Sequence, residues 1–466
     1  MSEGKLEKGL KQRHMTMISL GGVIGAGLFV GSGAVMNSTG PAAIVSYLAA
    51  GLLVVLVMRM LGEMAVADPT VGSFMEYTRK ALGERGGFTI GWLYWYFWAI
   101  VLAVEATAGA EILQNWLPGV PIWLMSLILM SILTATNLTS VKNYGEFEFW
   151  FASIKVAAIL VFIAIGIGYL VGIGGGDSPG LSNLTSHGGF FAQGGVTILS
   201  GIVIVIFAFV GAEIVTIAAA ESKEPERAVA RATQAIVWRV LVFYVLSVFL
   251  VVAILPWNAS EVGNSPFIAA LERVGIPGAA DIMNAIVVTA VLSCLNSGIY
   301  TGSRMLFSLA RRGYAPEALV ETNSRGVPVK GILLTVSIGF LSVIAAAIWP
   351  DTLFEWLVNS SGAVALFCYV MIAISQLRLR PRTDPEALTL KMWLFPWLTY
   401  LSIAAMVVVI GAMAFVDEVR SQLWWSLASL AIVVGLSWVL PGMRAPSSDA
   451  RRRRAGSGDR GTAATA

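Results

Sequence analysis

Charged residues are scarce in this sequence. Of its 466 residues, 13% are charged and 57% are hydrophobic, whereas a soluble protein is nearer a quarter charged. The mean hydropathy is +0.77. This composition excludes a soluble globular protein and predicts an all-α polytopic membrane protein.

Histidine and cysteine are also rare. The two histidines are too few for a His-based metal cluster, and Cys294 and Cys368 lie in apolar segments, which suits neither a disulfide nor a metal site. We therefore expect no metal, no cofactor and no nucleic-acid partner. The sequence contains no visible nucleophile–base set, so it does not predict an enzyme.

Apolar residues are gathered into twelve segments, each long enough to span about 30 Å of hydrocarbon. The segments are 15–36, 41–66, 87–116, 121–141, 147–172, 195–219, 232–255, 280–310, 330–349, 352–376, 394–415 and 422–440. Residues 15–440 are thus predicted to form a twelve-helix transporter domain. A polar segment, 1–14, without a cleavable signal precedes it, and a tail, 441–466, that we expect to be disordered follows it.

Basic residues lie almost wholly on one side of the predicted membrane. Of the 31 Lys and Arg, Arg273 and Arg420 fall on the opposite side and Lys155 lies inside a span. The positive-inside rule therefore predicts that both termini are cytoplasmic, in the inner (plasma) membrane of the cell. The run Arg451–Arg454 could contact anionic lipid of the bilayer, or be a solvated run that completes this topology signal.

The first apolar segment contains glycines where a membrane helix should be continuous. A regular helix is costly at these positions, which are Gly21, Gly22, Gly25, Gly27, Gly31 and Gly33. A second break is predicted within 207–213. Paired breaks in corresponding halves indicate the substrate site of a transporter. They fit two five-span repeats, about 15–172 and 195–376, followed by two further helices, 394–440.

Broken helices would expose backbone groups of both signs in the middle of the membrane. N–H groups near Ala26 and Gly27 would suit a carboxylate, and the carbonyls of Val23, Phe207 and Val210 would accept from an ammonium group. Together these groups match a zwitterion. The predicted substrate-binding residues are Val23, Ile24, Gly25, Ala26, Gly27, Phe207, Val210, Gly211 and Glu105. The alternative is that the glycines only let helices pack closely.

Lys155 lies about 13 Å inside the fifth segment, at 1.5 Å per residue, which is too deep for easy access to the cytoplasmic face. A buried lysine is expensive and can lose and regain a proton. We predict that it is the proton-coupling residue of a symporter. The alternative is a fixed cation that ties the fifth span to the broken first span.

Acidic residues occur at several positions within or beside the predicted spans. Glu105 in the third span could receive a substrate amine, relay a proton or simply be protonated and bonded between helices. Glu213 follows the second break and is predicted to support the broken helix by bonding its N–H groups. Glu146 and Glu148 open the fifth span, where acidic residues suit a helix N-terminus, and we assign them no chemistry.

Specific motifs are spread over nearly all of residues 8–440. They are Leu10–His14, Gly22–Phe29, Ser38–Pro41, Gly62–Val66, Lys142–Trp150, Gly211–Ile214 and Ser303–Phe307. Together they resemble the bacterial amino acid transporter family of the amino acid–polyamine–organocation superfamily. Four further stretches look most like the 4-aminobutyrate (GABA) permeases within it: Thr89–Trp95, Val120–Leu124, Val215–Ser222 and Pro396–Thr399.

The resemblance implies a five-plus-five inverted-repeat fold with broken helices 1 and 6, alternating access and proton-coupled uptake. It implies a carboxylate site at Ala26 and Gly27 and an aromatic gate at Phe207. Some relatives have serine at the position of Ala26, so any hydroxyl contact is missing here. Because the amine of GABA is farther from its carboxylate than in an α-amino acid, Glu105 becomes a more attractive partner for the amine.

The leading prediction is therefore a proton-coupled symporter that imports an amino acid, with GABA as the expected substrate. One alternative is a permease for α-amino acids, such as aromatic residues or proline, on the same fold. An alternative from another class is a nutrient sensor built on a transporter frame. A channel is disfavoured because broken helices should close around a ligand. The oligomeric state is left open.

Overall fold

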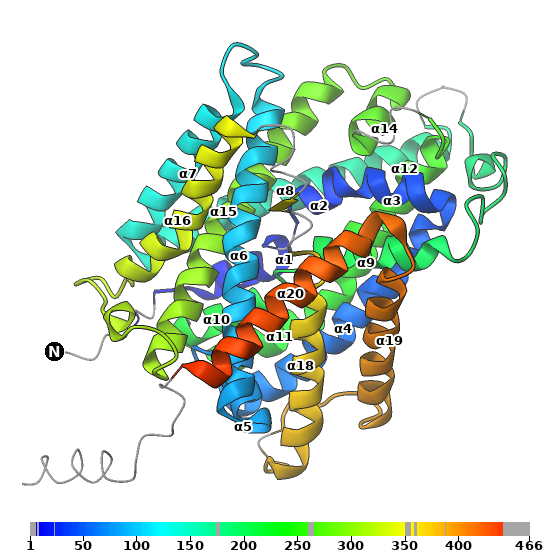
Figure 1. Cartoon of the computed structure of the whole chain (residues 1–466). Helices are drawn as coiled ribbons and strands as arrows, with labels where there is room; N and C mark the ends of the chain where they lie inside the picture. The colour runs from blue at the N-terminus through cyan, green and yellow to red at the C-terminus, as the bar shows by residue number, and fades with distance from the viewer. Residues whose placement is uncertain are drawn as a thin grey trace, which may run out of the picture.

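The structure is a computed structural model of the chain. It describes residues 6, 9–22, 24–173, 178–259, 265–349, 356–357, 361–386 and 388–440. Within these residues the secondary structure is helical, apart from one isolated parallel bridge between Leu10 and Ser222. This agrees with the predicted all-α class. Figure 1 shows the long helices α6 (Glu84–Leu113) and α15 (Ala279–Arg311), which pack against each other, crossing the bundle.

The remaining helices follow in chain order. Before α6 lie α1 (Gln12–Gly21), α2 (Ala26–Phe29), α3 (Gly31–Thr39), α4 (Ala43–Ala67) and α5 (Ser73–Leu82). Between α6 and α15 lie α7 (Ile122–Thr139), α8 (Val141–Leu170), α9 (Thr197–Phe209), α10 (Ile214–Ala218), α11 (Pro225–Arg239), α12 (Ser247–Ile254) and α14 (Pro266–Val274). After α15 come α16 (Val329–Ile348), α18 (Val364–Leu379), α19 (Trp397–Met413) and α20 (Asp417–Val439).

Nine helical runs in the described part of the chain are long and apolar enough to cross a membrane. Two shorter apolar helices, Val329–Ala345 and Trp397–Met413, accompany them. This number does not establish the twelve predicted spans. Residues 352–355 and 358–360 of the tenth predicted span lie outside the described residues, as do the predicted tail 441–466 and most of residues 1–8.

The helical backbone is interrupted at two places that the glycine pattern had marked. Helix α1 ends at Gly21 and α2 begins at Ala26, while α9 ends at Phe209 and α10 begins at Ile214. In the second interruption Gly211 has φ +107°, a conformation that side chains with a Cβ rarely adopt. Glycine is therefore required at this point of the chain if the two short helices are to keep their directions.

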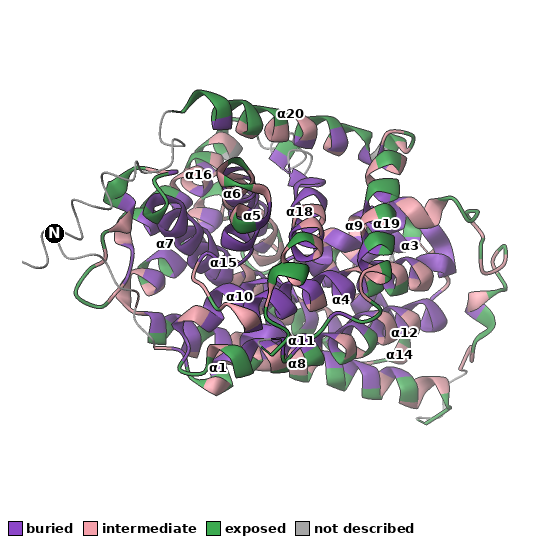
Figure 2. Cartoon of the chain, turned by 90° about the horizontal axis from the view of Figure 1, so that it is seen from below, coloured by how far each residue is buried: buried purple, intermediate pink, exposed green. Residues whose placement is uncertain are grey.

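Packing places both interruptions in the interior. Helix α1 packs against α8 and α11, α2 packs against α9 and α15, and α9 packs against α3 and α4. In Figure 2 the buried residues concentrate on the inner helices, while α20 at the edge of the view is largely exposed. Exposed side chains on α20 include Trp424, Trp425 and Ile432. Such apolar exposure suits helices that face lipid, because lipid tails are as apolar as these side chains.

Candidate functional site

A small cavity lies where the two interruptions meet α6 and α15. The fold brings five of the predicted substrate-binding residues to its wall, and they are Gly25, Gly27, Glu105, Phe207 and Val210. That these residues bind substrate stays a prediction.

Ile24 and Gly211, which were also predicted to bind substrate, do not line the cavity. Ile24 is fully buried outside the cavity wall, and its carbonyl accepts a hydrogen bond from Lys155 Nζ at 2.8 Å. Gly211 lies beside the cavity, where its N–H donates to Glu213. Val23 lies outside the described residues, and so does the side chain of Ala26. The carbonyl of Ile24 is thus already engaged by the protein itself.

Sequence reasoning missed the wall that α6 contributes. Phe97, Trp98 and Val101 line the cavity together with Glu105, at spacings that place them on one side of a helix. The rings of Phe97 and Phe207 pack edge to face, with centroids 6.0 Å apart. The helical spacing of these residues is the sequence signal that could have identified this wall. Only the packing of α6 shows that the face that carries them points to the interruptions and not to another helix.

Close packing decides which glycines matter for the cavity. A Cβ added at Gly25 would lie 3.2 Å from Glu105 Oε1 and 3.7 Å from Cys294 Sγ, so it would fill the cavity wall. A Cβ at Gly27 would lie 3.0 Å from the Cα of Ala208 and would push α2 away from α9. Gly27 therefore also serves helix packing, as the alternative interpretation of the glycines supposed.

Lys155 is held at the end of α1. This fully buried residue on α8 donates from Nζ to the carbonyls of Gly21 at 2.5 Å and Ile24 at 2.8 Å, and to Ser293 Oγ at 2.8 Å. The last carbonyls of a helix have no intrahelical partner, and Lys155 satisfies two carbonyls of this interruption. The cation thus ties α8 to the interruption, and a role in proton coupling stays a prediction.

Glu213 occupies the corresponding place at the second interruption. Its buried carboxylate accepts from the N–H of Gly211 at 3.1 and 3.2 Å, from Tyr94 Oη at 2.9 Å and from Tyr369 Oη at 3.1 Å. These donors come from the α9–α10 connection, α6 and α18. Hydrogen bonds to an ionised group are the strong ones, so Glu213 joins three elements that are distant in sequence.

Two more basic residues are buried within apolar helical runs, which corrects the prediction that Lys155 is the one basic residue inside a span. Arg239 is 3% exposed and donates to the carbonyl of Ser19 near the end of α1. Arg304 is 1% exposed and pairs with Glu221 at 2.9 Å. Both residues lie at least one helical turn from the nearest end of a predicted span. This distance from the span end is the sequence signal that could have predicted their burial.

Glu148 is misplaced by the sequence prediction. Helix α8 begins at Val141, so Glu148 is its eighth residue and not part of the first turn. It is fully buried and accepts from Ser293 Oγ at 2.6 Å and from Asn296 Nδ2 at 3.4 Å. Glu146, the sixth residue of α8, also lies outside the first turn, and its half-buried carboxylate pairs with Arg13 at 2.5 Å. The role in capping the helix does not apply to Glu148.

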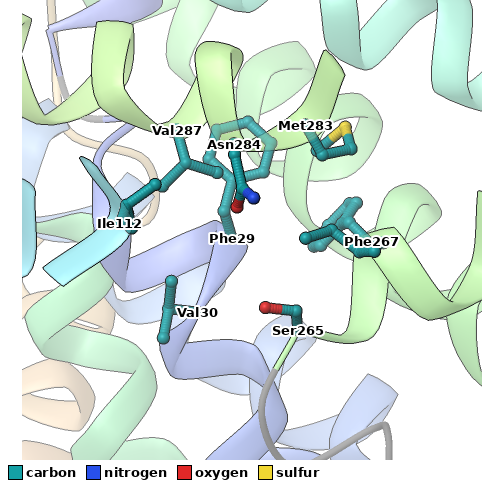
Figure 3. A pocket seen from close by; sticks show the side chains of 9 residues that line it. Phe29, Val30, Ile112, Ser265, Phe267, Met283, Asn284 and Val287 are labelled. Atoms are coloured by element: carbon teal, nitrogen blue, oxygen red, sulfur yellow. The ribbon is translucent and has the colours of Figure 1, made fainter. Parts of the chain in front are cut away.

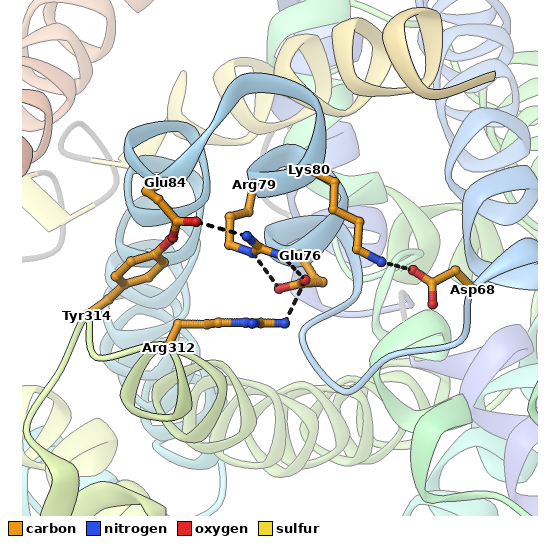
Figure 4. Close-up of polar contacts among 7 residues, drawn as sticks. All are labelled: Asp68, Glu76, Arg79, Lys80, Glu84, Arg312 and Tyr314. Atoms are coloured by element: carbon orange, nitrogen blue, oxygen red, sulfur yellow. Dashed lines mark hydrogen bonds and ion pairs between the residues drawn. The ribbon is translucent and has the colours of Figure 1, made fainter. Parts of the chain in front are cut away.

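Charged residues link the ends of three helices outside the cavity. In Figure 4, Glu76 of α5 lies between Arg79 and Arg312, with closest N–O distances of 2.7 Å to each. Arg79 also reaches Glu84 at the start of α6 at 2.9 Å. The hydrogen bonds to Glu76 raise the pKa of Arg79 above its usual range, which keeps the pair ionised. The cluster therefore fixes helix ends without contributing to the cavity.

A second small cavity lies on another side of α2 (Figure 3). Gly27 lines the first cavity and Phe29 the second, and residues two apart on a helix point about 200° away from each other. Phe29 packs edge to face on Phe267 of α14 with centroids 5.3 Å apart. The wall is mostly apolar, with Ser265 and Asn284 as its polar residues.

The chain is similar to known transport proteins. The amino acid permease family matches residues 14–445. The chain is 55% identical over 426 residues to a gamma-aminobutyric acid permease of Bacillus subtilis, which covers 91% of each chain. It is 49% identical over 420 residues to a gamma-aminobutyric acid permease of Escherichia coli, covering 88% of this chain and 89% of the relative. It is 40% identical over 459 residues to the aromatic amino acid transport protein AroP of Corynebacterium glutamicum, covering 95% and 98%.

Proposed function

We propose, from the premise that the chain belongs to the amino acid permease family, that it imports GABA together with protons by alternating access. Family membership makes it a multi-pass membrane protein that transports amino acids and not an enzyme. The choice of GABA is supported by the relatives, since those named for it are 55% and 49% identical and the one named for aromatic amino acids is 40% identical.

One structural observation carries the substrate assignment. The carboxyl group of Glu105, on a residue that is 4% exposed, lies in the same cavity as Gly25 and Gly27. The N–H groups of Ala26 and Gly27 precede the first intrahelical hydrogen bond of α2 and suit the substrate carboxylate. Glu105 then receives the amine. A longer amino acid such as GABA can use both partners, because its charged ends are separated by a methylene chain.

The architecture belongs to the same proposal. The interruptions between α1 and α2 and between α9 and α10 support broken spans one and six of a twelve-span, five-plus-five inverted repeat. Domain limits follow the predicted ranges, 15–440 for the transporter domain with repeats about 15–172 and 195–376. Both termini are proposed to be cytoplasmic in the plasma membrane, because the basic residues are concentrated on that side.

Counterflow in proteoliposomes tests the substrate. Vesicles that contain the purified protein and unlabelled GABA are expected to take up labelled GABA, with weak competition from a panel of α-amino acids. The physical reason is that an α-amine lies too near its carboxylate to reach both proposed partners. Exchange of an aromatic or other α-amino acid without exchange of GABA would keep the transport function and refute the substrate.

Replacing Gly25 tests the position of the site. Gly25→Ala is expected to weaken GABA binding about tenfold, because the added methyl group narrows the cavity beside Glu105 and overpacking costs about 1–3 kcal/mol. The Michaelis constant for GABA uptake measures the effect. Gly31→Ala is the matched control, since its Cβ would meet no atom within 4 Å. Equal Michaelis constants for the two variants would contradict the site.

A further inference from the structure

A chain of buried hydrogen bonds leads from Lys155 to Ser293 and Glu148, neither of which lines the cavity. Nζ of Lys155 donates to Ser293 Oγ at 2.8 Å, and Ser293 Oγ donates to Glu148 Oε1 at 2.6 Å. All three side chains are fully buried. An ammonium, a hydroxyl and a carboxylate thus follow one another, and each donor points to the next acceptor.

We propose that Glu148 takes the coupling proton from Lys155 through Ser293 and passes it toward the cytoplasm. The inference rests on the proposed function, because it requires proton-coupled transport. In the transfer, an N–H bond of Lys155 breaks while an O–H bond forms on Ser293, whose own proton moves to Glu148. The products are a neutral amine, an unchanged serine and a carboxylic acid, so charge and atoms balance.

Helix α8 carries both ends of the proposed proton path, Lys155 and Glu148, so the orientation of this helix gives the direction of the path. Glu148 lies seven residues before Lys155 on α8, or about 10 Å along the axis. Helix α8 begins at Val141, beside the basic Lys142 on the side proposed to be cytoplasmic. Glu148 therefore lies between Lys155 and that side, where a proton delivered by a symporter has to leave.

Other ionisable groups near the path are engaged differently. Lys155 interacts electrostatically with Glu148, Cys294 and Glu105, but Cys294 and Glu105 line the cavity. Glu148 does not line it, and the charged or titratable groups that the described residues place on its side include Tyr144, Arg304 and Glu221. Arg304 and Glu221 pair with each other. Glu148 is thus the carboxylate that Lys155 reaches through hydrogen bonds without passing through the substrate.

Further polar side chains surround the carboxylate of Glu148. Asn296 Nδ2 donates to its second oxygen at 3.4 Å, and Asn296 Oδ1 in turn accepts from Asn137 Nδ2 at 2.9 Å. A buried carboxylate needs such donors to remain ionised. A Glu148 carboxylate that only balanced the charge of Lys155 would make the same contacts. The proton-acceptor role and the counter-charge role therefore differ in proton flux and not in geometry.

The experiment measures two activities of the same proteoliposomes. GABA counterflow without a pH gradient reports binding and the conformational cycle, while uptake driven by an inward proton gradient, with a pH-sensitive dye inside, reports coupling. In Glu148→Gln, which keeps the shape of the side chain, gradient-driven uptake and GABA-dependent proton flux are expected to fall about 100-fold, as for loss of a positioned acid–base group. Counterflow is expected to persist.

Controls and a second variant make the test decisive. Glu146→Gln, two residues away on the same helix and at the surface, should keep both activities. Ser293→Ala removes the bridge but neither ionisable group, and it should reproduce the loss of proton flux. Equal loss of counterflow and driven uptake in both variants would overturn the relay in favour of a structural role, and unchanged proton flux in Glu148→Gln would also overturn it. Absence of proton-driven uptake by the unaltered protein would instead refute the proposed coupling, and the relay with it.

Discussion

Lys155→Gln is expected to abolish proton-driven accumulation of GABA while the protein still exchanges GABA to a measurable extent. A gradient of one pH unit can support about tenfold accumulation for each coupled proton, since one pH unit corresponds to about 1.4 kcal/mol. The glutamine amide can still donate to the carbonyls of Gly21 or Ile24 but does not titrate. The internal-to-external GABA ratio in proteoliposomes at steady state measures the effect and should fall to about one.

A second substitution separates the two roles of Lys155. Lys155→Ala removes the Nζ donor and leaves the buried carbonyl of Ile24 without it, at a cost of roughly 1–3 kcal/mol, whereas the carbonyl of Gly21 keeps the N–H of Ile24. Its thermal unfolding temperature in detergent should lie below that of Lys155→Gln. If Lys155→Gln accumulates GABA as well as the unaltered protein does, the lysine is a fixed tie between helices and not the coupling residue.

Glu213→Ala is expected to be the most destabilising single change at the site. It leaves the N–H of Gly211 and the hydroxyls of Tyr94 and Tyr369 without their acceptor. Three orphaned donors correspond to a loss of roughly 3 kcal/mol or more in the free energy of unfolding. Thermal unfolding of the purified protein in detergent measures this loss, and GABA exchange should disappear with it because the second interruption lines the cavity.

The control for Glu213 is chosen from the same stretch of chain. Glu226→Ala removes an exposed glutamate in the first turn of α11 and should change the unfolding temperature little. Tyr369→Phe removes one of the donors together with its need for an acceptor, and should cost less than Glu213→Ala. Equal unfolding temperatures for Glu213→Ala and Glu226→Ala would show that the carboxylate does not hold the interruption together.

The positions of the two interruptions could be predicted because their signal is local. Glycines at 21, 22, 25 and 27 weaken a helix wherever it lies, and α1 does end at Gly21. Gly211 has the positive φ that makes glycine necessary. Of the residues predicted to surround these interruptions, Gly25, Gly27, Glu105, Phe207 and Val210 come together at one cavity.

The environments of the charged residues could not be predicted in the same way. The apolar pattern predicts that the segment begins at residue 147, which places Glu148 in a first turn, whereas α8 begins six residues earlier, at Val141. That shift moves Glu148 from a helix end into the interior. Arg239 and Arg304 were counted among the basic residues of one side, and their burial depends on which helices cover them.

The sequence by itself determined that this protein is a helical membrane protein, at which glycines its helices are weakened and which family it resembles. Hydropathy, glycine content and motifs are properties of short segments, so they need no knowledge of packing. Only the tertiary structure decided that Lys155 engages the carbonyls of Gly21 and Ile24, that Ser293 links it to Glu148, and that α6 closes the cavity. The physical reason is that a hydrogen-bond partner across more than a hundred residues depends on the rotation and depth of two helices, and many packings with different partners satisfy the same apolar pattern.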